Sequence, residues 1–519
     1  MNAAEFLTIS AAVVPDRVAL VDPDDSCTYG ELQARVYRLA NALKTIGIEQ
    51  GRNIGVMAVN STAFIEIYHA AAIVGATFVP LNYRAKPEEL TYMINAADVN
   101  VLFISERYHS LMQEIRASIP GVAHVYALNF KADDISTLQD LRDQGSDDPI
   151  FSEGDDDDAS LVIYTSGTTA LPKGVVLTHK AISAFVLNTQ NPADPAGGQD
   201  VNLVAVPLFH IAGATQMIGP IFSGRKLAIL PQFDPAAWLA TVERERVTHS
   251  FVVPTMLKRL MDVDDFDSYD ISSLQNITYG AAPMPFEIVR QAIGVFDCGL
   301  MNAYGQTEST GSMTFLSPDD HRLDGTEEEN ALKLKRLRSV GSPMPDLEIG
   351  ILGADGQQLP SGEPGEICIA GDRIMREYQG QAEETKHAIQ GKWLHTGDIG
   401  YLDEDNYLFI TGRLKDLIIR GGENIAPAEI EQVLEDHPAI REAAVVGMPD
   451  AEWGETVLAI VVGAGTQASH DELTDFVKSH LASYKAPARY EWVDELPRNH
   501  MGKVLKNDLR DQFVPAEGG

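Results

Sequence analysis

The first stretch whose residue types could do chemistry runs from Leu161 to Val175 and reads L-V-I-Y-T-S-G-T-T-A-L-P-K-G-V. Its hydrophobic start is typical of a strand, and hydroxyl residues, small residues and Lys173 follow. Backbone N–H groups beside small residues, hydroxyl donors and one lysine can together wrap a chain of phosphate groups. The G-x-x-x-x-G-K-S/T spacing of a Walker loop does not occur here, and a plain structural turn is the alternative.

A second segment, from Asn302 to Glu308, combines an aromatic ring, a hydroxyl and a carboxylate. Tyr304 can stack beside a planar base, Thr307 can donate to a phosphate oxygen, and Glu308 can hold Mg²⁺, which prefers oxygen ligands. Taken alone, the same residues suit a buried tyrosine and a surface glutamate.

The charge balance limits the partners of the chain. Its 519 residues include 40 Lys+Arg and 75 Asp+Glu, a formal net charge of −35. Nucleic acids and anionic membrane surfaces are bound by clustered Lys and Arg, so both are excluded as general partners. The hydrophobic fraction of 45% can bury several cores, and the length suggests about two to four structural units.

The cysteines and the chain start indicate the compartment. Cys27, Cys298 and Cys368 are odd in number and far apart, which predicts no disulfide framework and no paired metal ligands. His179 and the other histidines show no zinc-ligand spacing. The first residues do not resemble a signal peptide, and no apolar run reaches the ~20 residues that span a bilayer. We therefore expect a soluble cytoplasmic protein without integral membrane association.

These segments need a scaffold, and the first half of the chain alternates helical and strand patterns. Thr28 stands three residues before Glu31, the spacing of a capping box, and apolar residues then follow at helical intervals up to Gly47. Strands separated by helices of this length predict parallel βαβ units and an α/β fold. We expect further helices over 64–74 and after Pro87, and strands over 54–59, 77–79, 99–104, 203–206, 226–230 and 250–253.

Two charged stretches stand out. The run Asp155–Asp158 is interpreted as a solvated linker that leads into the strand before the glycine-rich loop. The basic cluster Lys333, Lys335, Arg336 and Arg338 fits a solvated face, and the alternative is an anion-attracting patch near the mouth of a site.

The composition changes near Gly412. Strand patterns over 408–410 and 417–419 flank a polar segment, and short units follow it: helices over 426–434 and 471–481 and strands over 443–446 and 458–462. A small α+β domain of about a hundred residues is therefore predicted from about residue 414 onward. The polar, compact boundary suits a hinge.

The glycine-rich loop closely resembles the T-S-G-T-T-G-x-P-K-G signature of the adenylate-forming superfamily, which includes acyl-CoA synthetases, stand-alone adenylation domains and firefly-type luciferases. Ala170 replaces a glycine of the signature, which makes the loop slightly stiffer. The segment 302–308 resembles the aromatic–Gly–x–Thr–Glu motif of the same family. Further similar segments follow in the family's order, so the resemblance covers nearly the whole chain: Gly280–Pro283, His395–Asp398, Gly412–Asp416, Arg420–Ile425 and Leu496–Lys506.

The resemblance implies a fold and a set of site residues. The fold is a large N-terminal domain of βαβ layers plus a distorted barrel, residues 1–413, and a small mobile C-terminal domain, residues 414–519, with the hinge near Lys415. The residues implied as catalytic are Lys503, Glu308 and Thr169, with Mg²⁺ on Glu308. The residues implied in ATP or AMP binding are Thr165, Ser166, Gly167, Thr168, Thr169, Lys173, Gly280, Ala281, Ala282, Asn302, Ala303, Tyr304, Gly305, Thr307, Asp398, Arg413 and Lys503.

Further residues are implied for the second half-reaction and the acyl pocket. Gly421, Gly422 and Glu423 would enter the site when coenzyme A reacts. Phe209, His210, Gly280 and Gly305 would line the acyl pocket, although His210 could equally be a packing histidine. Many residues of this region are small and no obvious charge plugs the pocket, which favours an apolar medium- or long-chain acid. An amino acid is disfavoured, because family members that select one usually place an aspartate near His210.

The expected activity is therefore that of an ATP-dependent carboxylate–CoA ligase that forms AMP, pyrophosphate and an acyl-adenylate intermediate. An aryl- or cinnamate-type CoA ligase and an adenylation enzyme that loads a carrier protein are alternatives. A sensor that keeps the fold is the non-enzymatic alternative. Evidence against it is the joint presence of five residues: Thr169, Glu308, Asp398, Arg413 and Lys503. The expected partners are ATP, Mg²⁺, coenzyme A and a small carboxylic acid, and a homodimer is left open.

Overall fold

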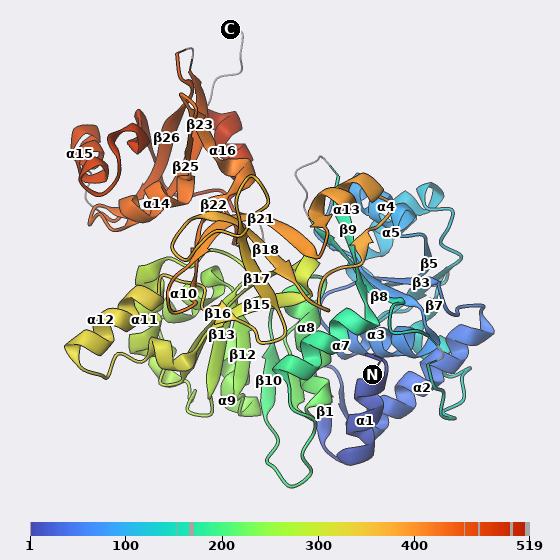
Figure 1. Cartoon of the computed structure of the whole chain (residues 1–519). Helices are drawn as coiled ribbons and strands as arrows, with labels where there is room; N and C mark the ends of the chain where they lie inside the picture. The colour runs from blue at the N-terminus through green and yellow to red at the C-terminus, as the bar shows by residue number, and fades with distance from the viewer. Residues whose placement is uncertain are drawn as a thin grey trace.

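A computed structural model of the chain describes residues 2–152, 154–165, 171–450, 452–465, 468–498 and 502–513, the side chain of residue 424 excepted. The described residues form four β-sheets with helices between and around them (Figure 1). The fold is mixed α/β, with a large N-terminal part and a smaller C-terminal domain, as predicted.

The first large sheet carries the strand that leads into the glycine-rich loop. Its eight strands are ordered β19-β9-β8-β4-β3-β5-β6-β7, and β8 (Ala159–Thr165) and β9 (Lys173–Thr178) pair antiparallel at one side. The predicted βαβ units are present, because β3 pairs parallel with both β4 and β5. The other elements of this layer are β3 (Asn53–Met57), β4 (Thr77–Pro80), β5 (Val99–Ile104), β6 (His124–Ala127), β7 (Ser136–Thr137), β19 (Glu377–Tyr378), α3 (Thr62–Val74), α4 (Pro87–Ala96), α5 (His109–Ile115) and α6 (Leu138–Arg142).

The second large sheet has nine strands in the order β16-β15-β14-β13-β12-β10-β11-β1-β2. Its strands β10 to β14 pair in parallel, as βαβ connections require. The elements of this layer are β1 (Val18–Val21), β2 (Ser26–Thr28), β10 (Val201–Val204), β11 (Lys226–Ile229), β12 (His249–Val252), β13 (Asn276–Gly280), β14 (Gly299–Gln306), β15 (Gly311–Leu316), β16 (Ser342–Pro343), α8 (Ile211–Phe222), α9 (Pro235–Glu245), α10 (Pro254–Met261) and α11 (Phe286–Val295).

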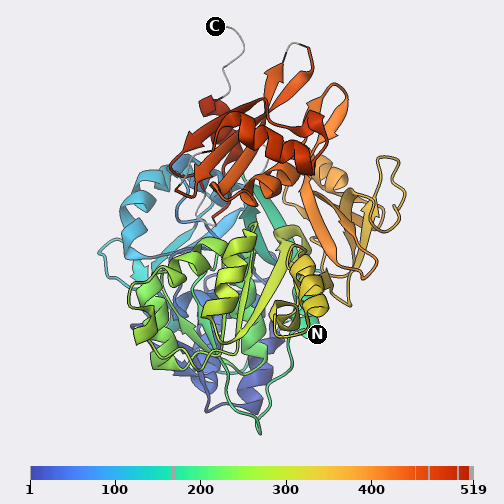
Figure 2. The same ribbon diagram turned by 90° about the vertical axis from the view of Figure 1, so that its left-hand side faces the viewer.

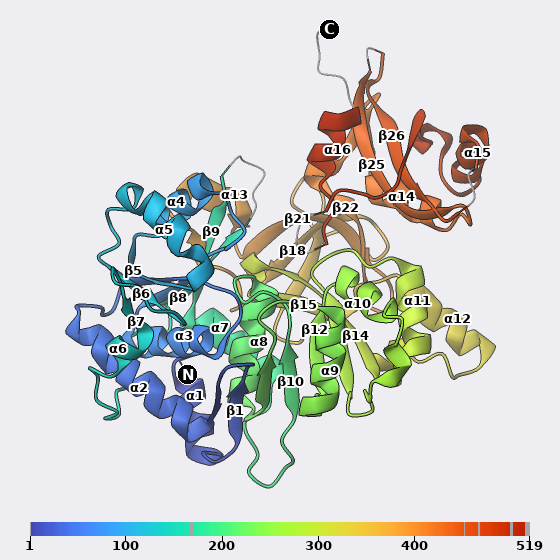
Figure 3. The same cartoon turned by 180° about the vertical axis from the view of Figure 1, so that it is seen from behind.

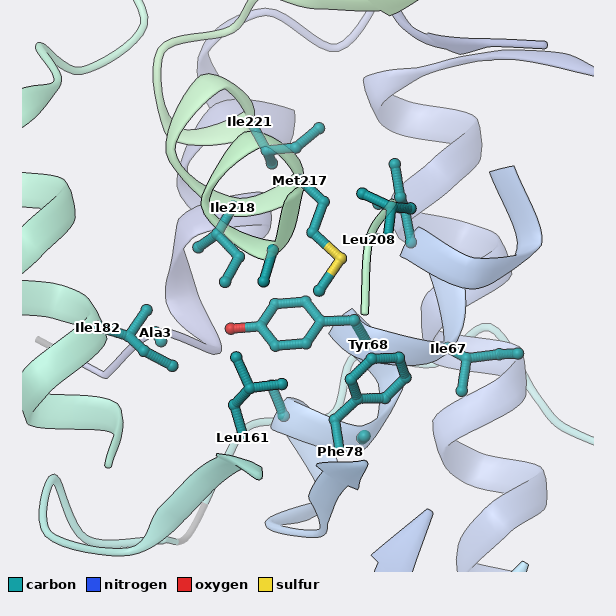
Figure 4. Close-up of a cluster of buried hydrophobic side chains, with 14 of the residues drawn as sticks. Ala3, Ile67, Tyr68, Phe78, Leu161, Ile182, Leu208, Met217, Ile218 and Ile221 are labelled. Carbon is teal, nitrogen blue, oxygen red and sulfur yellow. The ribbon is translucent and has the colours of Figure 1, made fainter. Parts of the chain in front are cut away.

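Helices fill the space between these two sheets, as the view from behind shows (Figure 3). They include α1 (Glu5–Val13), α2 (Tyr29–Thr45), α3, α7 (His179–Thr189) and α8. The capping box predicted for Thr28 and Glu31 begins α2. In the core, Tyr68 of α3 lies among Phe78, Leu161 and Met217, so strands of one sheet and helices of both layers share one buried cluster (Figure 4).

A third, five-stranded sheet is antiparallel throughout and is the part for which we expected a distorted barrel. It places the middle of β21 beside the end of β22, because Asp398 and Arg413, two predicted nucleotide-binding residues, are register partners there. Its strands and the helices next to it are β17 (Glu348–Leu352), β18 (Gly365–Ala370), β20 (Ile389–Gln390), β21 (Trp393–Leu402), β22 (Leu408–Arg413), α12 (Glu327–Arg336) and α13 (Ala382–Ala388).

The C-terminal domain lies above the rest of the molecule (Figure 2). Its two buried hydrophobic clusters consist of residues from Ile418 onward, whereas the clusters of the large part end at Leu408. A short 3₁₀ turn, η6 (Leu414–Asp416), connects the two parts and contains Lys415. The domain comprises β23 (Ile418–Arg420), β24 (Glu423–Ile425), β25 (Ile440–Asp450), β26 (Gly454–Gly463), β27 (Arg489–Val493), α14 (Pro427–Glu435), α15 (His470–His480) and α16 (Lys506–Phe513).

Both charged stretches make specific contacts. Asp155 to Asp157 are exposed, as a solvated linker would be, and the carbonyls of Asp156 and Asp158 also accept from the backbone N–H groups of Lys180 and His179 at the start of α7. In the basic cluster, Lys335 pairs with Asp403, Arg336 with Asp405 and Arg338 with Asp436, while Lys333 donates to the carbonyl of Arg322. These contacts favour a structural role for the cluster over an anion-attracting one.

Within the residues that the structure describes, no helix is both long and apolar enough to cross a bilayer.

Candidate active site

The β8–β9 hairpin presents the phosphate-loop lysine. Thr165 ends β8 and is the cross-strand partner of Lys173, the first residue of β9. The predicted residues Ser166, Gly167, Thr168 and Thr169 lie outside the described residues. The Lys173 side chain is only 11% exposed and forms an ion pair with Glu384 of α13. Its ammonium nitrogen lies 5.0 Å from the centroid of the Tyr378 ring, a cation–π distance.

Tyr378 connects this lysine to the predicted magnesium ligand. Its hydroxyl donates to Oε1 of Glu308 at 2.8 Å. Burial, followed by the charge of Glu308, raises the pKa of Tyr378, so the phenol stays protonated and remains a donor. Lys173 and Glu308, which are far apart in the sequence, thus meet through one tyrosine. The motifs of the sequence analysis pointed to neither Tyr378 nor Glu384.

Glu308 lies in a short 3₁₀ turn, η4 (Thr307–Ser309), between β14 and β15. Its neighbour Thr307 is buried, and the carbonyl of Glu308 accepts from the N–H of Met375 at 2.8 Å. Gly305 precedes this turn, and a Cβ built on it would lie 1.9 Å from the carbonyl oxygen of Gly311. The Glu308 carboxylate, whose Oε1 accepts from the Tyr378 hydroxyl, offers the oxygen ligands that Mg²⁺ prefers, so Glu308 is the side chain that would hold the ion.

Asp398 and Arg413 meet across the β21–β22 pair, where they are register partners. Nε of Arg413 lies 2.8 Å from Oδ1 of Asp398, and the hydroxyl of Tyr304 donates to Oδ2 of the same carboxylate at 2.7 Å. Burial and then the Asp398 charge hold the pKa of Tyr304 well above its ordinary value. Two predicted nucleotide-binding residues, Arg413 and Tyr304, therefore converge on the buried carboxylate of a third, Asp398, which can accept from the hydroxyls of a sugar.

Lys503 reaches this group from the C-terminal domain. Its pKa is lowered to about 8, first by burial and then by the positive charges of Arg413 and Lys415, while Asp398 and Asp416 oppose the shift. Burial and Arg413 also lower the pKa of Lys415. The site therefore gathers cations from both parts of a strongly acidic chain.

The residues predicted for the second half-reaction lie elsewhere. Gly421, Gly422 and Glu423 are exposed at the turn between β23 and β24. The two glycines have φ angles of 59° and 89°, which only glycine adopts without strain. In this arrangement of the two parts, the structure does not bring this turn into the site with Lys503.

The predicted acyl-pocket residues fall into two kinds. Phe209 is buried and packs edge-on against Tyr83, with 5.0 Å between the ring centroids. The centroid of the His210 ring lies 4.2 Å from that of Phe209. Gly280 ends β13, where a Cβ would lie 2.1 Å from the carbonyl oxygen of Ala303. The contacts between neighbouring strands are therefore enough to require glycine there and at Gly305. The other predicted residues nearby are Ala281 and Ala282, which follow β13, and Asn302 and Ala303 within β14.

Two cavities differ in their relation to this region. A cavity of 130 Å³ is lined by Tyr83, Arg84, Phe233, Thr255 and Arg259 and lies next to the segment that carries Phe209. A cavity of 280 Å³ lies at the other end of the first sheet, where β3, β4 and β8 begin and away from Thr165 at the end of β8. Its lining includes Gln50, Asp158 and Arg376. The larger cavity contains none of the predicted site residues, so its size does not mark the site.

One group among the described residues, Glu366, Cys368 and His395, has the composition of a metal site, with its ligand atoms within 4.8 Å of one another. Burial raises the pKa of the Cys368 thiol to about 12, so it is protonated and a poor ligand. Nδ1 of His395 lies 2.7 Å from Glu366, which also accepts from the N–H of Gly397 at 3.1 Å. These hydrogen bonds hold the turn before Asp398.

Known proteins are similar to this chain over nearly its whole length. Residues 7–379 match the family model of an AMP-binding enzyme, and residues 429–503 match that of the AMP-binding enzyme C-terminal domain. A fatty acid–acyl-carrier-protein ligase of Streptomyces coeruleorubidus is 33% identical over 96% of this chain and 94% of its own length. A feruloyl-CoA synthase of an Amycolatopsis species is 34% identical over 97% of both chains.

Solved structures agree with these sequence relatives. An amide bond synthetase from Marinactinospora thermotolerans is 30% identical, with a TM-score of 0.88 over 99% of this chain and 100% of the other. A Mycobacterium tuberculosis fatty acyl CoA synthetase is 31% identical, with a TM-score of 0.80 over 99% of both chains. The chain thus belongs to the AMP-binding enzymes of the adenylate-forming superfamily and is a ligase of the AMP-forming acyl-CoA synthetase type.

Proposed function

We propose that this enzyme joins an apolar carboxylic acid to coenzyme A in two half-reactions, adenylation and thioester formation. The observation that carries the proposal is the meeting of Lys503, from the C-terminal domain, with the Asp398–Arg413–Tyr304 group of the large domain. A nucleotide held by its ribose at Asp398 has its α-phosphate within reach of a cation from the other domain. A binding protein would not need such a cation.

In the first half-reaction, a carboxylate oxygen attacks the α-phosphorus of ATP and the bond to pyrophosphate breaks. The enzyme acts mainly by positioning the reactants and neutralising charge. Lys503 bridges the carboxylate and the α-phosphate, and Lys173, with the loop that it ends, orders the β- and γ-phosphates. Mg²⁺ bound at Glu308 would neutralise charge between the phosphates.

In the second half-reaction, the thiol of coenzyme A attacks the acyl carbon and AMP leaves. Gly421, Gly422 and Glu423 are exposed at the turn between β23 and β24 in this structure, so the C-terminal domain, residues 414–519, has to rotate about Lys415 to bring them to the acyl-adenylate. An acidic carrier protein is a less suitable acceptor than coenzyme A for a chain with a net charge of −35, because two large acidic surfaces repel each other.

The substrate that we propose is a medium- or long-chain fatty acid. Phe209 offers an apolar wall, and the segment 207–213 carries no acidic or amino-acid-binding carboxylate. An aromatic acid is the second candidate, supported by the edge-on pair of Tyr83 and Phe209 and by the 34% identity to the feruloyl-CoA synthase.

A pyrophosphate-release screen tests this function. Short, medium, long and aromatic carboxylates are each incubated with MgATP, with and without coenzyme A, and the thioester is detected by mass spectrometry. We expect coenzyme A-dependent turnover with apolar chains. Turnover only with aromatic acids would select the second candidate, and acyl-adenylate that accumulates without reacting with coenzyme A would point to a carrier-protein acceptor.

A further inference from the structure

The segment around Lys503 forms a small hairpin stem in the C-terminal domain. The N–H of Leu505 donates to the carbonyl of Pro497 at 2.8 Å, and Arg498 forms a β-bridge with Val504. Lys503 follows Gly502 directly and therefore lies at the end of this stem. Whatever fixes the stem also fixes the backbone from which the Lys503 side chain extends.

Arg498 holds the stem in two ways at once. One guanidinium nitrogen, NH1, donates to the carbonyl of Gly502 at 2.6 Å, and the other, NH2, donates to Oε2 of Glu442 on β25 at 2.5 Å. Both side chains of the ion pair are mostly buried, with 29% and 19% exposed, so solvent screens the pair only partly. The planar fork of arginine suits such a double contact, which a lysine cannot reproduce.

The other side of Lys503 is anchored as well. Lys506, at the start of α16, pairs with Glu431 of α14 at 2.6 Å, and the same Glu431 oxygen accepts from the N–H of Val445 at 2.7 Å. The segment that carries Lys503 is therefore tied to β25 and α14 on both sides.

Such anchoring has a physical reason. The Lys503 ammonium group is buried near two other cations, Arg413 and Lys415, which repel it. A Cβ on Gly502 would also lie 2.8 Å from a methyl carbon of Thr255, so the hairpin approaches α10 closely. A flexible lysine would move away from this position into water, so its backbone has to be held from the C-terminal domain side.

We propose that Arg498, oriented by Glu442, is the positioning residue that holds Lys503 in place for the adenylation half-reaction. The inference rests on the proposed function, because it assigns Arg498 to one of its two half-reactions. Arg498 acts through the backbone at Gly502 and does not contact substrate. Arg441, whose Nε lies 3.6 Å from Glu442, is the other cation at this carboxylate.

The test compares the two half-reactions in Arg498→Met and Glu442→Gln. Adenylation is measured by ATP–pyrophosphate exchange, and thioester formation by adding coenzyme A to a supplied acyl-adenylate. We expect exchange to fall by about 10- to 100-fold in Arg498→Met, the size of effect that a displacement of about 1 Å can have, while thioester formation stays within about twofold. Arg498→Lys should recover only part of the exchange activity. The double variant Arg498→Met with Glu442→Gln should lose little more exchange activity than Arg498→Met alone, because both substitutions remove the same contact.

Two further measurements separate positioning from a general loss of structure. Arg489→Met removes a comparable ion pair with Glu491 on β27 and should leave both half-reactions unchanged. In Arg498→Met, Lys503 would move into water, away from Arg413, Lys415, Asp398 and Asp416. Its pKa should then rise, so the pH above which exchange declines should rise as well.

Equal loss of both half-reactions in Arg498→Met, or unchanged exchange, would overturn the proposal. Exchange activity of the unmodified enzyme is measured first. Its presence supports the proposed function whatever Arg498→Met does, and its absence with every acid would count against the proposed function itself.

Discussion

Lys503 is partly buried near two further cations, Arg413 and Lys415, and this makes the charge of its ammonium group depend on pH near neutrality. Burial and the neighbouring charges lower its pKa to about 8, so the cation is present below that pH and is lost as the pH rises through it. If the cation bridges the carboxylate and the α-phosphate, kcat/KM for pyrophosphate exchange should fall above pH 8. The exchange assay contains no coenzyme A, so the titration of its thiol does not interfere.

The measurement is a profile of kcat/KM from about pH 6.5 to about pH 10, because this parameter reports ionisations of the free enzyme. Lys503→Arg is the control: its guanidinium stays charged, so its residual activity should show no decline in this range. A profile of the unmodified enzyme that is flat to pH 10 would show that adenylation does not depend on the charge of Lys503.

At the scale of elements, α3 and α6 are joined by a buried ion pair. Glu66 of α3 is 3% exposed and lies 2.9 Å from NH1 of Arg142 on α6. Burial raises the pKa of Glu66, which the Arg142 charge opposes. Arg142→Met should therefore destabilise the protein by about 3–5 kcal/mol, because it leaves an uncompensated charge in the core. Urea unfolding followed by tryptophan fluorescence measures the change.

The same variant should show a defined pH dependence. A carboxyl whose folded-state pKa is raised binds more protons folded than unfolded, so the loss of stability should shrink as the pH falls and Glu66 becomes neutral. Arg38→Met is the matched control on α2, since the Arg38–Asp147 pair is 47% and 56% exposed and its loss should cost less than about 1 kcal/mol. Equal effects of the two substitutions would mean that the burial of Glu66 has no energetic consequence.

For the whole molecule, the proposed function implies that the relative position of the two domains decides which half-reaction can take place. Arg338, after α12, pairs with Asp436, after α14, at 3.1 Å, and Gly502 approaches Thr255 of α10. These contacts join the two domains in an arrangement that places Lys503 at Asp398. A rotation about Lys415 would break them and bring Gly422 towards the site instead.

This arrangement leads to a prediction about Lys503→Ala. We expect the variant to lose pyrophosphate exchange by at least about 100-fold, since it removes a charge that acts in the transition state, and to keep thioester formation from a supplied acyl-adenylate. Rapid-quench assays of the two half-reactions measure the difference. A parallel loss of both would contradict the model of two domain arrangements.

The net charge is likewise a property of the whole molecule. ATP, coenzyme A and the carboxylate are anions, and the chain carries −35, so its overall field does not attract them. The local cations Lys173, Arg413, Lys415 and Lys503 must do so, at distances within the screening length of about 8–10 Å.

The local elements and the types of residue at the site could be predicted from the amino-acid sequence. The capping box of Thr28 and Glu31 begins α2, and Gly75, with φ of 73°, ends α3, because such signals depend on residues only a few positions apart. The alternation of strands and helices likewise predicted the parallel βαβ pairing. Motif residues such as Glu308 and Asp398 could be chosen because their segments resemble family motifs and because carboxylates suit metal and sugar chemistry.

Which of these residues lie together, and what else they contact, depends on how the chain packs in three dimensions. Lys173 pairs with Glu384, which is 211 positions away, and the basic residues 335, 336 and 338 are paired with aspartates that the sequence could not assign to them. Lys503 of the C-terminal domain lies close enough to Arg413 and Asp398 of the large domain for their charges to shift its pKa. Ion pairs of this kind depend on how sheets and domains pack, and local sequence patterns, which reflect neighbours within a few residues, do not contain that information.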